Sequence, residues 1–584
     1  MRGRFGERFK KGIVAAFFMF WIVYFFMFWA KGLYYDAFDN LVAGHVNIWG
    51  DWAAHMTMGT AMAVRGPLLS ESPLIVGQPF AYPFVSNMLS GFLFNLGFSL
   101  IDSFLFPSFF FSLAVVFALF WLYKTLFQSR KIALLATTIF LLNGGIGFYY
   151  FVQDIASSPK PLTTFLNPPH EYTRYDQKGI KWISVIDSMI IPQRAFGLGF
   201  PVGLLALGLI YQASFKKHSK QTNKKLVNTK MVQAGLLLGL LPIIHTHSFL
   251  ALFVILGCWS SGDILLIWLK EQKSKKLKEL LFKKILHWAS LAAITAVLAI
   301  PLISLFLLQN VENFITWYPG WLAIDFKENW FVFWFKNWTI VPLLAGAGWL
   351  LLLQSKKRVI RNFGILFLPF FILFTVANLW LFQPYAWDNT KLLIWSSVGF
   401  SGLSAWLLNK GWIHATSLIP HKKIILKSLL VICFCFVTAS GVIDTYYISR
   451  HDLHSHVMFS KEEVDLASWA RKNTPPDSRW LTGEQHNHWL FVLTGRQTLM
   501  AYRGWLWTHG YDYKPVEAAV SKMFMHPEGN ANLFKQYDVD YIVIGPNEKM
   551  VWQANTQYFA DHAEQFTLIK LTENYSIYQA AEAI

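Results

Sequence analysis

Eleven long apolar runs constrain the fold of this chain more than any other feature of its sequence. A helix needs roughly 17–25 predominantly apolar residues to cross the hydrocarbon core of a bilayer. Only 15% of the residues are charged, whereas soluble domains carry roughly 25%. The sequence therefore predicts a polytopic α-helical membrane protein with about 11–13 transmembrane helices. The runs lie near residues 12–30, 106–123, 132–151, 194–213, 232–249, 250–269, 286–308, 339–354, 363–381, 391–408 and 425–446.

Lysine and arginine are concentrated in short loops between these runs, and their placement predicts the topology. Cytoplasmic loops carry the excess of positive charge, so we place the N-terminus inside together with the loops 124–131, 214–230, 270–284, 355–361 and 410–427. The segments that then lie outside are 31–84, 152–193, 309–338, 382–390 and 447–584. The same rule accounts for the formal net charge of +17, so no nucleic-acid partner is predicted.

A shorter apolar run at 85–100 leaves one question open. If this run crosses the bilayer, the basic loop 124–131 falls on the wrong side. Either the run is re-entrant, or the charge rule fails at this weakly basic loop.

The chain is expected to divide into a transmembrane module and a soluble tail. The module covers residues 1–446, with 31–84 as its first outer loop, and residues 447–584 form an extracytoplasmic domain. Residues 461–473 have a helical period that ends at the sequence TPP. The β-rich segment 539–545 is followed by a helical stretch and by two strand-like pieces, at 566–571 and 575–579. This alternation predicts a small α/β domain.

The first outer loop carries four candidate side chains for catalysis: Asp36, Asp39, Asp51 and His55. If residues 51–64 are helical, Asp51 and His55 share one face because they are four residues apart. A carboxylate and an imidazole on one face could act as a general base or bind a divalent cation. The alternative is that Asp51 only caps the N-terminus of a surface helix.

Two cations at the starts of later apolar runs are candidates for binding a phosphate. The guanidinium of Arg194 could hold a lipid phosphate, or it could simply snorkel to the headgroups. Lys391 follows Asp388 by three residues at the start of a predicted helix. The lysine could bind phosphate there, and the aspartate could cap the helix.

Histidines mark two further outer segments. The runs 232–249 and 250–269 must form a tight hairpin if both flanks are inside, and its apex LPIIHTHSFL holds His245 and His247. Ionisable groups at membrane depth are costly and are functional by default, although a hydrogen-bonded core histidine is the alternative. Loop 152–193 adds a polar cluster of His170, Glu171 and Arg174.

The soluble tail contains two histidine-rich motifs, HDLHSH at 451–456 and EQHNHW at 484–489. Solvent-exposed loop histidines explain them better than a metal site does. The three cysteines lie inside apolar runs, so neither a disulfide nor a zinc site is predicted. The sequence has no P-loop, no Ser/His/Asp signature and no HExxH motif, so nucleotide chemistry has no support.

Taken together, these features resemble those of the GT-C superfamily of integral membrane glycosyltransferases. The resemblance rests on the acidic first outer loop and on the segment PFAYPFVSNMLSGFLFNLG, which leads into an apolar span and the basic turn KTLFQSRK. Many helices before an extracytoplasmic tail complete it. The resemblance implies transfer of a sugar from a polyprenyl-phosphate carrier to a glycan, lipid or protein acceptor. It also implies that the chain lies in a bacterial inner membrane and acts at the outer face.

The same resemblance implies roles for individual residues. An acidic residue of the first outer loop would deprotonate the acceptor or help to hold a divalent cation, Mg²⁺ or Mn²⁺. Asp51 matches this role best, with Asp36 and Asp39 as further candidates and His55 as a second metal ligand. Arg194 and Lys391 would then steady the departing phosphate.

Two other functions are compatible with the sequence. A transporter or flippase would place polar groups near the bilayer midplane, commonly in repeated halves, whereas here they gather at one face and no repeat is visible. A non-catalytic envelope assembly protein would use the tail. The tail's YRGWLWTHG segment is aromatic enough to contact a carbohydrate or protein, or it forms the tail's own core.

Overall fold

The computed structural model describes residues 2–216, 228–272, 275–308 and 315–581. Parts of three predicted loops, at 217–227, 273–274 and 309–314, lie outside the described residues. The chain forms two compact units that do not follow chain order. The first unit comprises Met1–Phe28, Phe110–Ile303 and Phe314–Arg450, and the second comprises Trp29–Phe109, Ser304–Asn313 and His451–Ile584.

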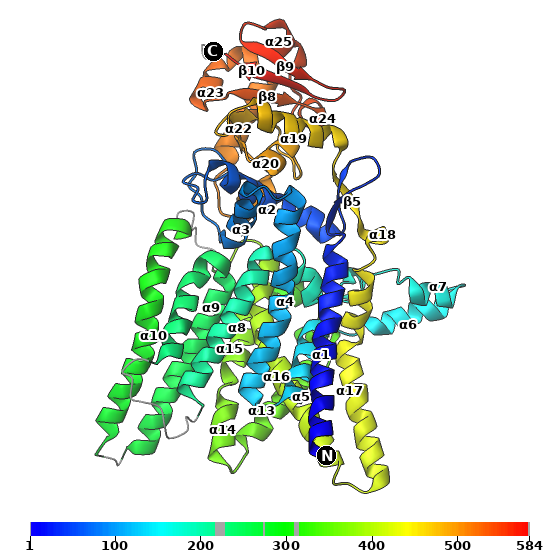
Figure 1. Cartoon of the computed structure of the whole chain (residues 1–584), viewed down its shortest axis with the longest axis vertical. Helices are drawn as coiled ribbons and strands as arrows, with labels where there is room; N and C mark the ends of the chain where they lie inside the picture. Colours follow the sequence, from blue (N-terminus) through cyan, green and yellow to red (C-terminus); the bar gives the residue numbers. More distant parts are fainter. Residues whose placement is uncertain (1, 217–227, 273–274, 309–314, 582–584) are drawn as a thin grey trace. The chain divides into compact units, whose positions relative to one another are not determined.

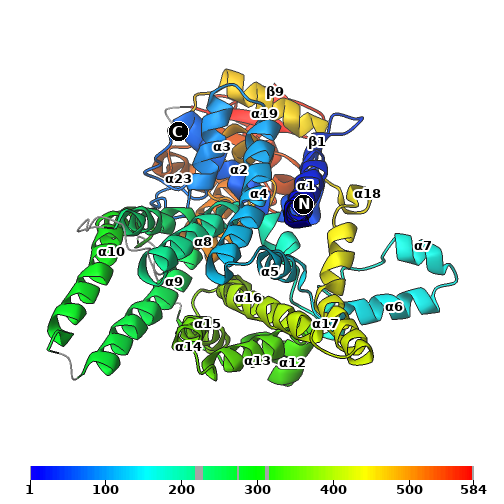
Figure 2. The same ribbon diagram turned by 60° about the horizontal axis from the view of Figure 1, so that its bottom comes forward.

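The first unit is a helical bundle whose long helices lie side by side in Figures 1 and 2. Among the described residues, eight helices are long and apolar enough to cross a membrane, or ten if each of two bent helix pairs is one span. The eight are α1 (Arg2–Trp29), α4 (Leu100–Phe127), α8 (Arg194–Ser214), α9 (Thr229–Glu271), α10 (Leu277–Phe306), α14 (Arg358–Ile365) continued by α15 (Leu368–Leu379), α16 (Thr390–Ala415) and α17 (Pro420–Tyr447). The prediction of a polytopic helical membrane protein is confirmed.

The two bent pairs replace two of the predicted straight spans. They are α5 (Arg130–Leu142) with α6 (Gly147–Ser157), bent by 63°, and α12 (Trp330–Trp338) with α13 (Val341–Leu353), bent by 94°. The short elements of this unit are α7 (Pro161–Leu166), α11 (Trp321–Ile324), β3 (Thr316–Trp317) and β4 (Trp380–Leu381), and β3 pairs with β4 in an antiparallel ribbon. Figures 1 and 2 show α6 and α7 extending sideways from the bundle.

Helix α9 contains both of the predicted runs 232–249 and 250–269. A straight helix of 43 residues would be about 65 Å long, roughly twice the thickness of the hydrocarbon core. The backbone leaves the helical region at His245, where φ is −160° and ψ is 94°. The break therefore lies at the predicted apex of the hairpin.

Packing against α10 shows that α9 reverses direction at this break. On α9, Gly239 lies against Leu298 of α10. Gly235, one turn before Gly239, lies against Ile294, which is one turn before Leu298. This first arm is thus parallel to α10, and a straight continuation would carry the second arm past the end of α10. Instead, Asp263 forms an ion pair at 2.8 Å with Lys284, close to the start of α10. The two arms form the hairpin that the sequence predicts.

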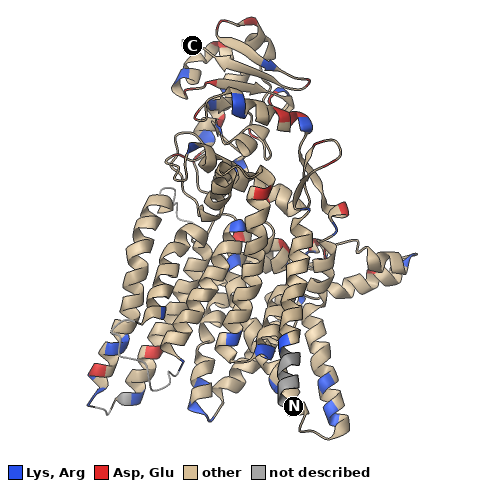
Figure 3. Cartoon of the chain, in the orientation of Figure 1, with Lys and Arg blue, Asp and Glu red and all other residues tan. Residues whose placement is uncertain are grey.

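The apolar run at 85–100 does not form a spanning helix. Its N-terminal part is α3 (Val85–Asn95), whose 11 residues give about 17 Å of helix, roughly half of what a span needs. With this run excluded, two spans separate the N-terminus from the basic loop 124–131, so both lie at the same end of the bundle, as the charge rule requires. Figure 3 shows Lys and Arg gathered at the end of the bundle where α1, α10 and α17 begin. Which face of the membrane this end occupies stays a prediction.

The second unit is built around a five-stranded sheet with the strand order β7-β6-β8-β10-β9. Strand β6 is parallel to β7 and β8, whereas β10 is antiparallel to β8 and β9. The strands are β6 (Arg479–Leu481), β7 (Gln497–Thr498), β8 (Tyr541–Ile544), β9 (Phe566–Leu571) and β10 (Ser576–Ala580), and the helices of the tail are α18 (His451–His454), α19 (Lys461–Asn473), α20 (Trp489–Thr494), α21 (Arg503–Thr508), α22 (Lys514–Met525), α23 (Ala531–Gln536), α24 (Pro546–Met550) and α25 (Thr556–Asp561).

The predicted bounds of one helix and two strands of the tail agree closely with the structure. The predicted helix at 461–473 is α19, which begins at a capping box formed by Ser460 and Glu463. The strand-like pieces predicted at 566–571 and 575–579 are β9 and β10. The α/β character of the tail is therefore confirmed.

The second unit also includes the segment predicted as the first outer loop. Its hairpin of β1 (Leu33–Tyr35) and β2 (Leu41–Ala43) pairs with β5 (His456–Phe459), which follows more than 400 residues later. Helix α2 (Val46–Arg65) packs between α3 and α20. At the contact with α20, Gly495 has φ +72°, and a Cβ there would lie 2.5 Å from the Thr60 carbonyl oxygen, so only glycine fits.

Candidate functional site

Asp51 and His55 lie on α2, one turn apart on the same face of the helix. The helix is capped by His45, whose Nδ1 accepts a hydrogen bond from the Asn47 N–H at 3.2 Å. Asp51 is six residues further along, so the alternative that it caps this helix is wrong. Its carboxylate is half-buried and is therefore placed for a role other than capping.

His55 is held in one orientation by a buried amide. The imidazole is 4% exposed, and its Nδ1 lies 3.0 Å from Oδ1 of Asn87 on α3. The amide nitrogen of Asn87 donates to the sulfur of Met58 at 3.3 Å, which fixes the amide so that Oδ1 faces the ring. Nδ1–H therefore donates to Asn87, and the lone pair of His55 is on Nε2.

Aromatic side chains of the tail cover the start of α2. The rings of Trp49 and His486 are stacked, with centroids 5.1 Å apart and an interplanar angle of 12°. Tyr502 and Trp505 pack on the same imidazole, and their ring centroids lie 4.9 and 5.1 Å from the centroid of the His486 ring. Burial lowers the pKa of His486, so its ring is neutral at pH 7. Asp51 thus lies two residues from an aromatic surface that could stack against a sugar ring.

A second set of contacts joins the same helix to the tail. The ring of Tyr82 contacts both His55 and His509. Its centroid lies 6.3 Å from that of His55 and 4.7 Å from that of His509. The hydroxyl of Tyr511 donates to the Pro79 carbonyl oxygen at 3.2 Å and accepts from the Ala81 N–H at 3.3 Å. The YRGWLWTHGYDY segment therefore packs on the first outer loop within the second unit.

The prediction that the tail histidines are solvent-exposed is wrong for most of them. His451, His454 and His488 are buried, with 8%, 7% and 2% of their surface exposed. They pack inside the second unit: His451 Nδ1 donates to the Gly44 carbonyl oxygen at 2.8 Å, and the His454 ring lies 5.3 Å from that of His45. A loop that closes over another segment buries its polar residues, which local composition does not reveal.

Asp36 and Asp39 lie in the loop of the β1–β2 hairpin, and each already has a partner there. The carboxylate of Asp36 accepts from the N–H groups of Phe38 and Asn40 and from the Asn40 amide, at 2.8 to 3.0 Å. Desolvation opposes the effect of these bonds, but they hold the pKa of Asp36 below its ordinary value. Asp39, at φ +61°, forms an exposed ion pair with Lys461. Both aspartates therefore shape the hairpin, which leaves Asp51 as the strongest candidate base.

Asp51 and His55 do not make a complete metal site with other residues that the structure describes. Within the described ranges, no three His, Cys, Asp or Glu side chains are grouped so that they could hold an ion. Asp51 and His55 would supply two ligands, whereas Mg²⁺ takes six in an octahedron. A divalent cation at this pair stays a prediction, and we assign no chemical step to it.

A separate polar cluster lies in the first unit, where α8, the turn of α9 and the start of α16 pack together. Arg194 is the first residue of α8 and is 2% exposed, so it does not snorkel to headgroups. Lys391 is the second residue of α16, and its ammonium is 2.9 Å from the carboxylate of Asp388. His247 Nε2 lies 2.7 Å from Oε1 of Gln383. We call these residues, together with His245, the helix-start cluster.

The hydrogen bonds of His245 determine which of its nitrogens carries the proton. The Ser248 N–H donates to Nδ1 at 3.3 Å, and the Ser248 hydroxyl, which accepts from Trp395 Nε1, lies 2.7 Å from the same nitrogen. Nδ1 is thus an acceptor, and the proton of the neutral ring is on Nε2. The residue is 3% exposed, and Nε2 has no hydrogen-bond partner among the described residues. A buried N–H donor needs an acceptor, which a water molecule or a ligand oxygen can supply.

Three features favour an anion beside the Nε2–H donor of His245. A Cβ on Gly199 would lie 2.3 Å from the His245 Cβ, so only glycine allows α8 to approach the α9 turn this closely. The charge of Lys391 acts on the rings of both His245 and His247. The starts of α8 and α16 add the positive ends of two helix dipoles. Around His245, the helix-start cluster therefore combines the cation of Lys391, an N–H donor and the N-termini of two helices, one of which begins with Arg194.

The third predicted cluster surrounds a cavity of about 350 Å³ in the loop after α7, still within the first unit. His170, Glu171 and Arg174 all line this cavity. The loop is anchored by Asp444 of α17, whose two carboxylate oxygens each accept a backbone N–H at 2.6 Å, from Tyr172 and Thr173. Burial and the nearby charge of Asp187 raise the pKa of Glu171 to about 8.

Protonation of Glu171 is expected to make the stability of the protein depend on pH. The pKa of Glu171 in the folded state lies above the ordinary 4.5. The stability that protonated Glu171 contributes to the folded protein is therefore complete below pH 4.5 and is lost as pH rises through 8. We expect the wild type to lose on the order of 1–3 kcal/mol across this interval, and the Glu171→Gln variant to lose much less. Thermal unfolding of both proteins between about pH 5 and pH 9 tests this. Equal slopes would show that Glu171 is not the titrating group.

No protein-family model matches the sequence, and no curated protein is similar to it in sequence. The oligosaccharyltransferase of Archaeoglobus fulgidus in its apo form gives a TM-score of 0.52 at 10% identity, over 94% of this chain and 71% of that chain. The same enzyme, AglB, in complex with an inhibitory peptide and a dolichol-phosphate gives 0.50 at 12% identity, over 98% and 75%. AglB is a membrane glycosyltransferase of the GT-C superfamily.

The chain has the GT-C fold. ArnT from Cupriavidus metallidurans in its apo state is also similar, with a TM-score of 0.47 at 11% identity over 98% of both chains. The likeness to the two oligosaccharyltransferase structures confirms, for the fold, the GT-C resemblance that the sequence suggested. The comparisons do not test the individual site residues, which stay predictions.

One residue that shapes the candidate site was not singled out from the sequence. Asn87 orients His55, and it is fully buried inside the apolar run 85–100. An amide in such a run is a usable signal, because a buried polar group needs a partner. His486 and Trp505 lie in the motifs EQHNHW and YRGWLWTHG, which the sequence did single out. Their contacts beside α2 had no sequence signal, because Trp49 lies more than 400 residues away from them in the chain.

Proposed function

We propose that this protein is a membrane glycosyltransferase that moves a sugar from a polyprenyl-phosphate-linked donor to an acceptor at the extracytoplasmic face. The GT-C fold carries the proposal, because the likeness to AglB extends over 98% of the chain and so includes both units. AglB was solved with a dolichol-phosphate, which is a polyprenyl-phosphate lipid. A lipid-linked donor is therefore the class of substrate that we assign to this chain.

The helix-start cluster supports a phosphate-binding role. The transferred sugar leaves a lipid phosphate that gains negative charge, and buried cations and N–H donors stabilise such a charge far better than water-exposed ones. Arg194 offers a planar guanidinium for two parallel hydrogen bonds. Lys391 supplies a point charge, and His245 supplies the Nε2–H donor. Asp388 holds the ammonium of Lys391 in place.

Asp51 is proposed as the general base. In the transfer, the acceptor's oxygen or nitrogen forms a bond to the anomeric carbon while the bond from that carbon to the phosphate oxygen breaks. The acceptor's proton passes to the Asp51 carboxylate, and the electron pair leaves with the polyprenyl phosphate. Attack opposite the leaving group inverts the anomeric carbon. The Trp49–His486 aromatic surface beside Asp51 suits a sugar ring.

Binding of the donor lipid is the first expected result that tests this function. We expect a polyprenyl phosphate to bind the purified protein saturably, and Arg194→Gln and Lys391→Gln each to weaken binding by about 10–100-fold, because each removes a charge-assisted contact. Lys357→Gln is the matched control, since Lys357 is exposed and lies in a basic turn of the same unit. Native mass spectrometry or microscale thermophoresis in detergent gives the affinities.

Each outcome of this experiment separates the candidate functions. Loss of affinity in both cluster variants but not in Lys357→Gln supports the phosphate site. No saturable binding to the wild type removes the proposed donor and leaves transport or envelope assembly. Binding that persists while no sugar is released from a lipid-linked donor, in membranes that supply the acceptor, would favour a flippase.

A further inference from the structure

A groove opens between α5, α16 and α17 in the first unit, away from the helix-start cluster. It encloses about 350 Å³ and lies where α5 begins and α16 ends. Leu408 follows Lys391 by 17 residues on α16, which corresponds to about 26 Å along the helix. The two sites are therefore distinct. The lining residues are Lys131, Leu134, Leu135, Leu408, Asn409, Trp412, Leu430, Val431 and Phe434.

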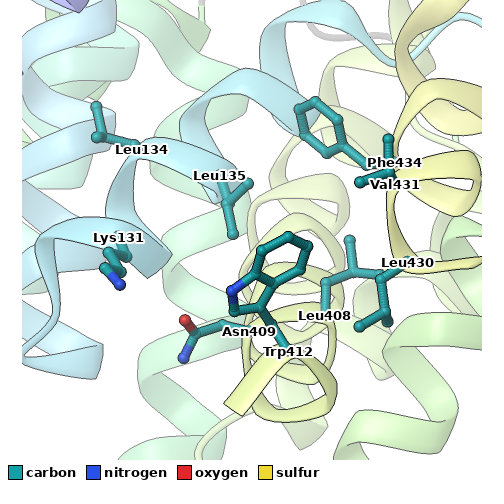
Figure 4. Close-up of a pocket in the computed structure, with 9 residues that line it drawn as sticks. All are labelled: Lys131, Leu134, Leu135, Leu408, Asn409, Trp412, Leu430, Val431 and Phe434. Atoms are coloured by element: carbon teal, nitrogen blue, oxygen red, sulfur yellow. The ribbon is translucent and has the colours of Figure 1, made fainter. Parts of the chain in front are cut away.

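The walls of the groove are apolar and come from three helices. Figure 4 shows Trp412 in the middle, with Leu135 of α5 on one side and Leu430 and Val431 of α17 on the other. Helices α16 and α17 approach closely beside it, since a Cβ on Gly411 would lie 3.1 Å from the Leu430 side chain. A hydrocarbon chain is the ligand chemistry that such walls favour, because it packs against them through dispersion contacts and leaves no polar group without a partner.

Positive charge lies at the rim of this apolar groove. Lys131 lines it directly, and the ammonium of Lys427 lies 4.6 Å from the centroid of the Trp412 ring. The ammonium of Lys410 lies 6.0 Å from the centroid of the Trp406 ring. None of the nine lining residues is acidic. Tryptophan and lysine together are typical of the membrane–water interface, so the rim matches the depth of a lipid headgroup.

We propose that this groove binds an anionic phospholipid. One acyl chain lies among Leu135, Leu408 and Leu430, and the phosphate lies between Lys131 and Lys427, with Asn409 as a hydrogen-bond donor. Basic pockets between transmembrane helices are suited to anionic headgroups. A second protein copy is a poorer fit, because a stable interface covers roughly 800 Å² per partner, far more than this narrow groove offers. The proposal does not depend on the glycosyltransferase function.

Photocrosslinking in nanodiscs tests the proposal on the full-length protein. The probe is a phosphatidylglycerol with a diazirine in one acyl chain, present as a minor component of phosphatidylcholine nanodiscs. We expect label on α5, α16 and α17 at the lining residues, displaced by unlabelled phosphatidylglycerol but not by more phosphatidylcholine. Lys131→Gln and Lys427→Gln should each weaken this competition by about five-fold.

Two further variants make the test decisive. Leu135→Trp fills the groove and should abolish the label there, provided that its thermal unfolding matches that of the wild type. Lys357→Gln removes a basic residue elsewhere in the bundle and should change nothing. Label spread evenly onto exposed apolar faces such as Val297 and Ile300 of α10, or competition by both lipids alike, would overturn the proposal. A concentration-dependent dimer that shields the groove would overturn it as well.

Discussion

Asp51→Asn is expected to abolish sugar transfer while the protein stays folded and still binds the donor lipid. The amide has the size of the carboxylate but cannot accept the acceptor's proton, and loss of a general base typically costs 10²–10⁴-fold in rate, so we expect a fall of about that size. Asp51 is half-buried on α2, so replacing it by an isosteric side chain leaves the packing unchanged. Transfer is measured as release of polyprenyl phosphate in membranes that supply the acceptor.

Asp39→Asn is the matched control for this prediction. Asp39 belongs to the same segment, but it lies in the hairpin loop with 69% of its side chain exposed and pairs with Lys461. An exposed ion pair of this kind contributes little, so the control should keep nearly wild-type transfer. Wild-type rates in Asp51→Asn would exclude Asp51 as the base. Loss of transfer in Asp39→Asn instead would point to the hairpin as the site.

Glu548→Ala is expected to destabilise the second unit by about 3–5 kcal/mol. Glu548 is 1% exposed, and its carboxylate accepts the N–H groups of Gly483 and Gly545 at 2.8 and 2.9 Å, with His488 at 3.3 Å. These contacts join the loop after β6 to the loop after β8. Alanine would leave two buried N–H donors without an acceptor, which costs more than the bonds themselves contribute.

The stabilisation by the Glu548 carboxylate is expected to decrease at low pH. Burial opposes ionisation, but the hydrogen bond and charge of His488 and the Gly483 N–H hold the pKa of Glu548 below its ordinary 4.5. The stabilisation is therefore present above pH 4.5 and is lost as pH falls through the folded-state pKa. This is the opposite sign to that of Glu171.

Hydrogen exchange of the β6 and β8 amides in the full-length protein measures the effect of Glu548→Ala. Glu528→Ala is the control, because that carboxylate is 54% exposed, and surface changes usually stay within about 0.5 kcal/mol. Similar exchange in the two variants would show that the buried carboxylate is not a main anchor. Glu548→Gln should fall between them, because its amide oxygen can still accept one of the two N–H groups.

Local signals in the sequence predicted much of the secondary structure. Apolar runs of bilayer length became helices, because burying them in lipid or protein is favourable whichever neighbour they find. The capping pair Ser460 and Glu463 fixed the start of α19, and alternating residues fixed β9 and β10. The hairpin at His245 followed from loop charge alone, since both flanks are basic.

For the run at 85–100, local signals did not predict whether the segment crosses the membrane. Its composition is that of a membrane span, yet the helix α3 ends at Asn95 and the next helix begins only at Leu100. Helix α3 packs against α2 with Gly91 close to Gly59. Apolarity reports that a segment is buried, and it does not report which surface buries it. The length of the helix, set by its tertiary packing, decided that this run does not cross.

The sequence by itself determined the class of protein, the positions of most helices, the α/β character of the tail, and the choice of Asp51, Arg194, Lys391 and His245 as candidates. Only the tertiary structure decided that the first outer loop and the tail form one unit, that Trp49 stacks on His486, and that the starts of α8 and α16 meet the α9 turn. The physical reason is distance along the chain. Periodicity and capping act over a few residues, whereas a contact such as that of Trp49 with His486 joins segments more than 400 residues apart. Such contacts depend on which surfaces are complementary in three dimensions.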